Sequence, residues 1–197
     1  MITSIKRGLR FIWLNRRDNV SVLDLRDDAA WRLPATAPGR ACREMQAVDL
    51  RSDDFAGFGQ ERLERAKARF ETCRGVTVVE LDRPLGWAFM TTAPRPREGR
   101  PPLVYAVTPG PGWAYVFDVF ARPEARRRGV ARDLLVCCAR LAAEQGLAGL
   151  FLTHAHPAMT RAAAGLGFQT VGILTFRQVF GIKCSDLSAL DRINPRK

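Results

Sequence analysis

The chain has 197 residues, and its 47% hydrophobic and 26% charged content is ordinary for one folded globular domain with a single core. Lysine and arginine together number 31 against 20 acidic residues, which gives a formal net charge of +11. No apolar run is long enough to cross a bilayer, and the first residues lack the apolar stretch of a secretory signal.

The positive charge suits three kinds of partner: nucleic acid, an anionic membrane, and a phosphate-rich cofactor or acidic protein. No motif that reads DNA or RNA accompanies the charge, and most aromatic residues lie in apolar runs typical of a core. We therefore expect no nucleic-acid partner. A generally basic surface accounts for most of the excess.

The cysteines are odd in number and lack any C-x-x-C spacing. This pattern favours reduced thiols in a cytoplasmic protein over a disulfide framework or a zinc site. Two of them lie within an apolar helical pattern and are expected to be small buried hydrophobes. The five are Cys42, Cys73, Cys137, Cys138 and Cys184, of which Cys137 and Cys138 form the apolar pair.

Residues 1–40 are predicted to form a basic amphipathic arm and linker that precedes a main domain of residues 41–197. Apolar residues at helical spacing, with arginines and lysines between and after them, predict a short helix over residues 2–17. Such a helix can contact a membrane surface or a partner, although docking onto its own domain is more common. The sequence also leaves a homodimer open. Residues 20–25 alternate like a short strand, and residues 33–40 resemble a linker.

Strands and helices then follow one another through the main domain, with a strand–helix–strand unit at its centre. We predict strands at 41–50, 76–81, 85–90, 103–107, 113–121, 147–153, 168–173 and 174–179, helices at 59–72, 130–145 and 157–164, and a proline-rich loop at 92–102. This order indicates a mixed α/β fold.

An arginine-rich turn lies where the strand 113–121 gives way to the following helix. The first amides of a helix lack internal partners and face the positive end of its dipole, so they form a natural anion site. Gly129 lets a ligand approach the backbone because it has no side chain, and Ala131 leaves the next approach unobstructed. Arg126, Arg127 and Arg128 add charge suited to a pyrophosphate. A solvated run of arginines before an ordinary helix start is the alternative.

The run from Asp118 to Ala131 resembles the central motif of the GNAT acyltransferase superfamily. That motif has the form [QR]-x-x-G-x-[GA], which Arg126, Gly129 and Ala131 match. The segments 165–168 and 79–86 are also similar to the family, so the resemblance covers roughly residues 41–181. It implies a central, mostly antiparallel sheet, splayed between its fourth and fifth strands and flanked by helices.

The resemblance also implies a reaction and its ligands. An acetyl (acyl) group would pass from acetyl-CoA, the donor cosubstrate, to the amine of a small molecule or peptide by direct attack on the thioester, without a metal. The strand near Val119 and Ala121 would pair with the pantetheine amides, as an added strand pairs with an open sheet edge. The pyrophosphate would lie on the turn formed by Arg126, Arg127, Arg128, Gly129, Val130 and Ala131.

The catalytic residues that the resemblance implies differ from the usual set. The family often has an asparagine and a tyrosine in its fourth helix, and the matching positions here are His156 and Ala163. His156 is therefore a candidate polar contact, acid or base, and Tyr115 occupies a position where some members carry an acidic base. Asp118 is expected to be structural and to point away from Tyr115, since strand residues alternate. Catalysis by positioning or through a water molecule is an alternative.

Two other functions remain open from the sequence. The missing tyrosine and the basic first residues also suit a non-catalytic acyl-CoA-binding or interaction module. In a third interpretation the chain is an acyltransferase that uses a long-chain acyl donor in place of acetyl-CoA. If a carrier protein holds that acyl chain, an acidic carrier would complement the positive charge of this chain.

Overall fold

The computed structural model describes residues 13–26, 33–50, 60–100, 103–179, 182–191 and 193. Two short 3-10 turns, η2 (Ala47–Leu50) and η4 (Pro123–Ala125), join the helices and strands. The strands and helices are β1 (Trp13–Asp24), β2 (Arg40–Glu44), α2 (Gln60–Phe70), β3 (Arg74–Glu80), β4 (Arg83–Thr91), β5 (Arg95–Arg100), β6 (Leu103–Val107), β7 (Trp113–Ala121), α3 (Val130–Glu144), β8 (Gly149–His154), α4 (Pro157–Ala164), β9 (Gln169–Val179), β10 (Ile182–Asp186) and α5 (Ser188–Asp191).

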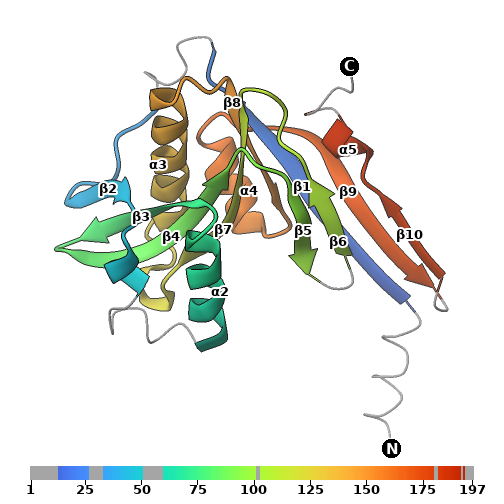
Figure 1. Cartoon of the computed structure of the whole chain (residues 1–197), viewed down its shortest axis with the longest axis horizontal. Helices are drawn as coiled ribbons and strands as arrows, with labels where there is room; N and C mark the ends of the chain where they lie inside the picture. Colours follow the sequence, from blue (N-terminus) through green and yellow to red (C-terminus); the bar gives the residue numbers. More distant parts are fainter. Residues whose placement is uncertain are drawn as a thin grey trace, which may run out of the picture.

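Eight strands form one sheet in the order β10-β9-β1-β8-β7-β4-β3-β2, and β5 pairs with β6 in a separate hairpin in front of it (Figure 1). All neighbours in the large sheet are antiparallel except β7 and β8. Helices flank the sheet on both faces. The predicted mixed fold with a mostly antiparallel central sheet is confirmed.

The predicted helix over residues 2–17 is wrong where it overlaps β1, and residues 2–12 lie outside the described residues. β1 is an inner strand with antiparallel partners on both sides, β8 and β9. Its backbone gains a hydrogen-bonded neighbour on each edge, which outweighs the helical spacing of a few apolar side chains. This part of the segment assigned to an arm therefore belongs to the sheet.

Three further boundaries differ from the sequence prediction. The strand expected at 41–50 ends at Glu44, and η2 follows it. The proline-rich loop contains β5, which tolerates proline because each strand of a two-stranded sheet has a free edge. The two strands expected at 168–173 and 174–179 are one continuous strand, β9, and β10 extends the sheet beyond it.

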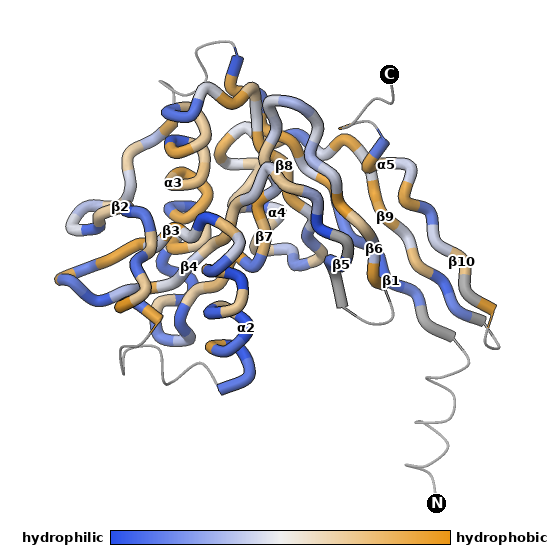
Figure 2. Tube along the Cα trace, viewed as in Figure 1, coloured by the Kyte–Doolittle hydropathy of each residue, from blue (hydrophilic) through white to orange (hydrophobic). Residues whose placement is uncertain are grey.

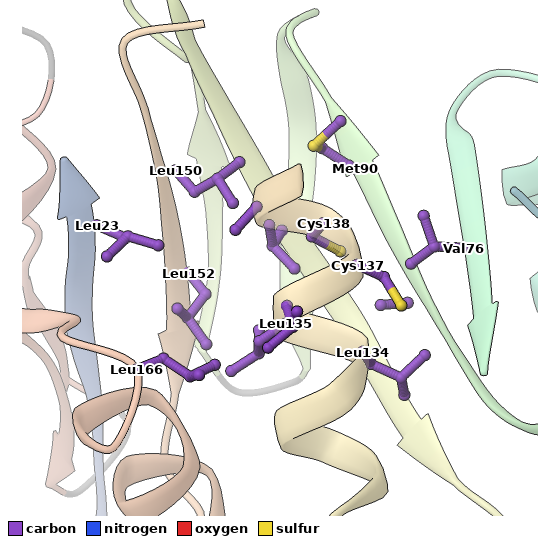
Figure 3. Packing of buried hydrophobic residues seen from close by; sticks show 14 of the residues in the cluster. Leu23, Val76, Met90, Leu134, Leu135, Cys137, Cys138, Leu150, Leu152 and Leu166 are labelled. Atoms are coloured by element: carbon purple, nitrogen blue, oxygen red, sulfur yellow. The ribbon is translucent and has the colours of Figure 1, made fainter. Parts of the chain in front are cut away.

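One face of the sheet packs against α3 and α4. Leu134, Leu135 and Cys138 of α3 are fully buried against apolar residues of β3, β4, β7 and β8. Figure 3 shows part of this packing, with Val76 of β3 and Leu150 of β8 on the two sides of α3. α3 is largely hydrophobic along its length, whereas α2 is largely hydrophilic (Figure 2). The difference in composition places α3 within the core and α2 at its edge.

A second, more aromatic core lies on the opposite face, under α2, the β5–β6 hairpin and α5. Residues that alternate with those of the first face point into it, including Phe89 of β4, Phe117 of β7 and Phe151 of β8. The ring of Tyr115 lies 5.4 Å from that of Phe117 and 5.1 Å from that of Phe151, measured between centroids. The two cores fix which face of β7 and β8 each side chain occupies.

A disulfide joins Cys42 of β2 to Cys137 of α3. The prediction that all five cysteines are reduced is therefore wrong for this pair, whereas Cys73, Cys138 and Cys184 are free thiols. The spacing between cysteines cannot reveal such a bridge, because its two residues are 95 apart in sequence and become neighbours only when α3 packs on the sheet. Burial raises the pKa of the Cys138 thiol to about 12.

The parallel pairing of β7 with β8 covers only Trp113 to Val116 and Gly149 to Leu152. Beyond these residues the two strands separate, although β7 continues to Ala121 and keeps its pairing with β4 on the other side. The predicted splay between these strands is thus present. The β8-facing edge of residues 117–121 of β7 has no strand partner among the described residues.

A β-bulge lies in β7 just beyond the point of separation. Between Trp87 and Phe89 of β4 the register shifts by one residue, so that two residues of β7, Asp118 and Val119, face Ala88 alone. Asp118 has a φ of 50°, an uncommon conformation for a residue with a side chain. The bulge re-aims the side chains of β7, and it explains why Asp118 reaches the same cavity as Tyr115.

The close approach of β4 to β7 near this bulge predicts a strict requirement for glycine at position 86. A Cβ atom on Gly86 would overlap the carbonyl oxygen of Phe120 and lie 3.0 Å from Cα of Ala121. We expect Gly86→Ala to lower the free energy of unfolding by at least about 2 kcal/mol in urea titrations, because backbone atoms must move. Gly165→Ala is the control, since its φ is −65° and its nearest contact is 3.3 Å. Equal stability of the two variants would contradict this account.

Candidate active site

The turn before α3 presents open backbone amides. α3 begins at Val130, and its N-cap residue Gly129 has a φ of 82°. Among the described residues, the amides of 127–132 donate to no backbone carbonyl. A Cβ atom on Gly129 would meet nothing within 4 Å, so the space beside this residue of the turn is open. This geometry is suited to an anion with several acceptor oxygens.

A buried arginine fixes the position of this turn. Nη1 of Arg40, on β2, donates to the carbonyl oxygen of Arg128 at 2.7 Å and to Oδ2 of Asp133, in the first turns of α3, at 2.9 Å. Its Nε donates to Oε1 of Glu80 at 3.1 Å. The side chains of Arg40 and Asp133 are 6% and 1% exposed, so the pair is shielded from solvent screening. The turn is thereby tied to two strands and to its own helix.

The three arginines of the turn have different surroundings. Arg128 pairs with Glu80 at 2.6 Å, and Nε of Arg126 donates to the carbonyl oxygen of Ala121 at 3.4 Å. Arg127 is exposed and has a φ of 61°. The guanidinium groups of Arg128 and Arg40 lower the pKa of Glu80. Arg128 therefore holds the turn as well as adding charge to it.

A cavity of about 480 Å³ lies at the splay, where β7 and β8 separate. Its walls come from five segments of the chain: β1, α2, the β5–β6 hairpin, β7, and the end of β8 with the start of α4. Among the predicted residues it brings together Tyr115, Val119 and His156, whereas the arginine turn lies outside its walls. Ala163, at the position of the family's tyrosine, is 1% exposed and packs in the first core.

Three hydroxyl groups meet in this cavity. Oγ1 of Thr153 lies 2.6 Å from the phenol oxygen of Tyr105 and 2.9 Å from that of Tyr115. Thr153 is the first residue of β8 beyond its pairing with β7, so the cluster stands at the point of separation. Burial raises the pKa of Tyr105, and it raises the pKa of Tyr115 well above 10. Both phenols are therefore neutral hydrogen-bonding groups at physiological pH and not bases.

The two histidines of the segment 154–156 have separate roles. Nδ1 of His156 accepts a hydrogen bond from the amide of Ala158 at 3.1 Å, so this exposed ring caps α4 while it lines the cavity. His154 is buried, with Nε2 3.0 Å from Oγ of Ser21 and Nδ1 3.3 Å from Oγ1 of Thr160. Burial lowers the pKa of His154, while the nearby Asp18 carboxylate opposes that effect.

Two buried carboxylates that were not predicted from the sequence line the cavity. Asp18 of β1 is 2% exposed and Glu98 of β5 is 6% exposed. Asp18 lay in the segment predicted to be helical, and Glu98 lay in the expected loop, so neither was assigned to a site. Tyr105 and Thr153 were missed for a similar reason, because they become neighbours only through the packing of the hairpin on the sheet. A buried charged residue cannot be told from an exposed one by its type alone.

The described residues include no helix that is long and apolar enough to cross a membrane. Within the same part of the chain, no group of three histidine, cysteine, aspartate or glutamate side chains is arranged to hold a metal ion.

Comparison with protein families gives one match that covers more than half of the chain. The family is described as the acetyltransferase (GNAT) family, and its model matches residues 44–168. This range includes the arginine turn, both splayed strands and α4. No curated protein matches the chain.

Several solved structures are similar in fold. A GCN5-related N-acetyltransferase from Sphaerobacter thermophilus has 16% identity and a TM-score of 0.56, with 90% of this chain and 56% of that protein covered. One from Kribbella flavida has 14% identity and a TM-score of 0.52, with coverage of 88% and 62%. A putative GNAT-family acetyltransferase from Novosphingobium aromaticivorans has 18% identity and a TM-score of 0.51, with coverage of 83% and 70%. The chain thus spans less than two thirds of the first two proteins.

The buried environment of His154 predicts a loss of stability in mild acid. Because its pKa is lower in the folded than in the unfolded chain, the unfolded chain binds more protons below a pH of about 6.5. The free energy of unfolding should therefore be highest above this pH and fall as the pH decreases through it. Urea titrations of the wild type and of His154→Gln between pH 5 and pH 8 measure the effect. The variant should lose less stability than the wild type over this range, and parallel curves would refute the assignment.

Proposed function

The chain belongs to the GNAT acetyltransferase family, and we propose that it transfers an acetyl group from acetyl-CoA to the amine of a small molecule or peptide. One observation carries the proposal: the open amides before α3 and the cavity at the splay are connected by the unpaired edge of β7. The amides would bind the diphosphate of the donor, the edge of β7 would pair with its pantetheine arm, and the cavity would hold the acceptor.

The donor would lie along residues that are already positioned. The amides before α3 would receive the pyrophosphate, with Arg126 and Arg127 beside them. Residues 117–121 of β7, which include Val119 and Ala121, would pair with the pantetheine amides in place of the missing strand. The thioester would then reach the point where β7 and β8 separate, next to the cavity.

In the proposed reaction, the amine nitrogen forms a bond to the thioester carbonyl carbon and the carbon–sulfur bond breaks. The nitrogen loses one proton, and the leaving thiolate, whose pKa in free thiols is about 8.5, either gains one or departs as the anion. Much of the acceleration can come from holding the two reactants together. Tyr115 would hold Thr153 in place, and His156 is the exposed titratable ring at the cavity that can exchange a proton with solvent.

Donor binding is tested at Gly129. A phenylalanine at this position would cover the open amides, so Gly129→Phe should abolish binding of acetyl-CoA as measured by calorimetry. Gly146→Phe is a matched control, because Gly146 ends the same helix with a φ of 69° and has no atom within 4 Å of a built Cβ. Both variants carry a similar strain of about 1–3 kcal/mol. Binding that survives in Gly129→Phe, or is lost equally in the control, would contradict the proposed donor site.

Catalysis is tested with His156→Asn, which keeps a side-chain acceptor at the N-cap of α4. If the ring transfers a proton, kcat should fall by about 100-fold or more while the melting temperature and the KM for acetyl-CoA stay unchanged. Release of the CoA thiol in the presence of amine acceptors measures the rate. An unchanged kcat would show that the histidine only caps α4, and it would favour catalysis by positioning.

The same assay separates the other two functions. Binding of acetyl-CoA without thiol release across a broad panel of amines would favour a non-catalytic module. Faster turnover of long-chain thioesters than of acetyl-CoA would identify a long-chain acyl donor.

A further inference from the structure

Three ion pairs have their carboxylate in the wall of the cavity, those of Asp18, Glu98 and Asp118. In each pair the carboxylate is more buried than the guanidinium group: Asp18 is 3% exposed against 30% for Arg16, and Glu98 is 6% against 19% for Arg95. The pair of Asp118 with Arg69 follows the same order, with 15% against 19%. The carboxylates are therefore the more buried members of these pairs, and they point a set of acceptor oxygens toward the cavity that they line.

Glu98 has an oxygen that its own ion pair does not use. Nε and Nη2 of Arg95 both contact Oε1, each at 2.8 Å. Oε2 accepts no hydrogen bond from another described residue, and it is not one of the fully buried atoms without a partner, so a ligand in the cavity can reach it. A carboxylate with a free acceptor in a buried wall favours a cationic donor such as an ammonium group. Asp18, in the same wall, adds a second negative charge.

The arginines differ in how firmly they are held. The guanidinium groups of Arg69 and Arg95 lie 5.1 Å and 4.4 Å from the ring centroid of Phe117, in addition to their ion pairs. Arg65 of α2 also lines the cavity, and it forms an ion pair with Glu61, whose side chain is 89% exposed. An exposed pair of this kind is weak, because water screens both charges and fixing two long side chains costs entropy. Arg65 can therefore exchange Glu61 for an anionic group in the cavity at little cost.

We propose that the acyl acceptor is an amine that also carries a carboxylate or phosphate group. Its ammonium group contacts Glu98 and Asp18 on binding and gives one proton to water before the neutral nitrogen attacks the thioester. Its anionic group contacts Arg65, whose planar guanidinium group binds such anions with two parallel hydrogen bonds. The inference rests on the proposed function, since it assigns the acceptor of the same cavity. Arg65 and Glu98 are accordingly the residues that determine acceptor specificity.

The experiment compares acceptors in matched pairs. β-Alanine and its amide differ by a carboxylate, and phosphoethanolamine and ethanolamine differ by a phosphate. For each pair, kcat/KM is measured with acetyl-CoA in the wild type, Arg65→Gln, Glu98→Gln and Lys67→Gln. Lys67 is the control, because it lies on the same helix and forms a similar exposed ion pair, with Glu64, but does not line the cavity.

The wild type should prefer the anionic member of at least one pair by 10-fold or more, and the pair that shows the preference identifies the anion. Arg65→Gln should reduce this preference by about 10-fold, through a higher KM for the anionic acceptor alone. Glu98→Gln should raise the KM for both members of the pair, and Lys67→Gln should change neither.

Two results would overturn the inference without touching the proposed function. One is acetyl transfer in which the wild type shows no preference for the anionic member of either pair. The other is an Arg65→Gln variant that keeps the wild-type preference, or that loses the same factor on charged and neutral acceptors. By contrast, a wild type that transfers acetyl to no amine at all would contradict the proposed function itself.

Discussion

The short parallel ladder between β7 and β8 is the constraint on which the rest of the site depends. Four residue pairs hold the strands together, and beyond Val116 and Leu152 each strand keeps its outer partner and loses the inner one. Here β4 supports one half and β1 the other, while α3 and α4 cover the back of both. The opening creates an unpaired backbone edge and a cavity at the same place.

The surroundings of this opening were predictable in part. The turn before α3 was located from residues 126–131 because a helix start and a glycine are local features, and Gly129 indeed has the positive φ that favours glycine. The cavity could not be predicted in this way, because its walls come from segments that are far apart in the sequence. Asp18 lies in a segment with helical spacing, and Glu98 lies among prolines. Both become buried only when β1 enters the sheet and the β5–β6 hairpin covers it.

The charges of the chain illustrate the same limit. A net charge of +11 suggested a generally basic surface, yet several arginines have specific structural partners. Arg40 links β2, β3 and α3 through Glu80 and Asp133, and its side chain is 6% exposed. An arginine in such a place acts as a fixed donor of hydrogen bonds, because its charge persists at any physiological pH. Composition counts these residues with the solvated ones and cannot separate them.

The position of β1 has a consequence for the order in which the protein folds. Most of the chain lies between this strand and its two partners, since Asn19 pairs with both His154 and Ile173. During synthesis β1 emerges early and has no neighbour until β8 and β9 follow. The half of the sheet built from β2, β3, β4 and β7 can form first, because its strands are closer in sequence. We therefore expect closure of the sheet around β1 to be a late, long-range step that completes the cavity wall carrying Asp18.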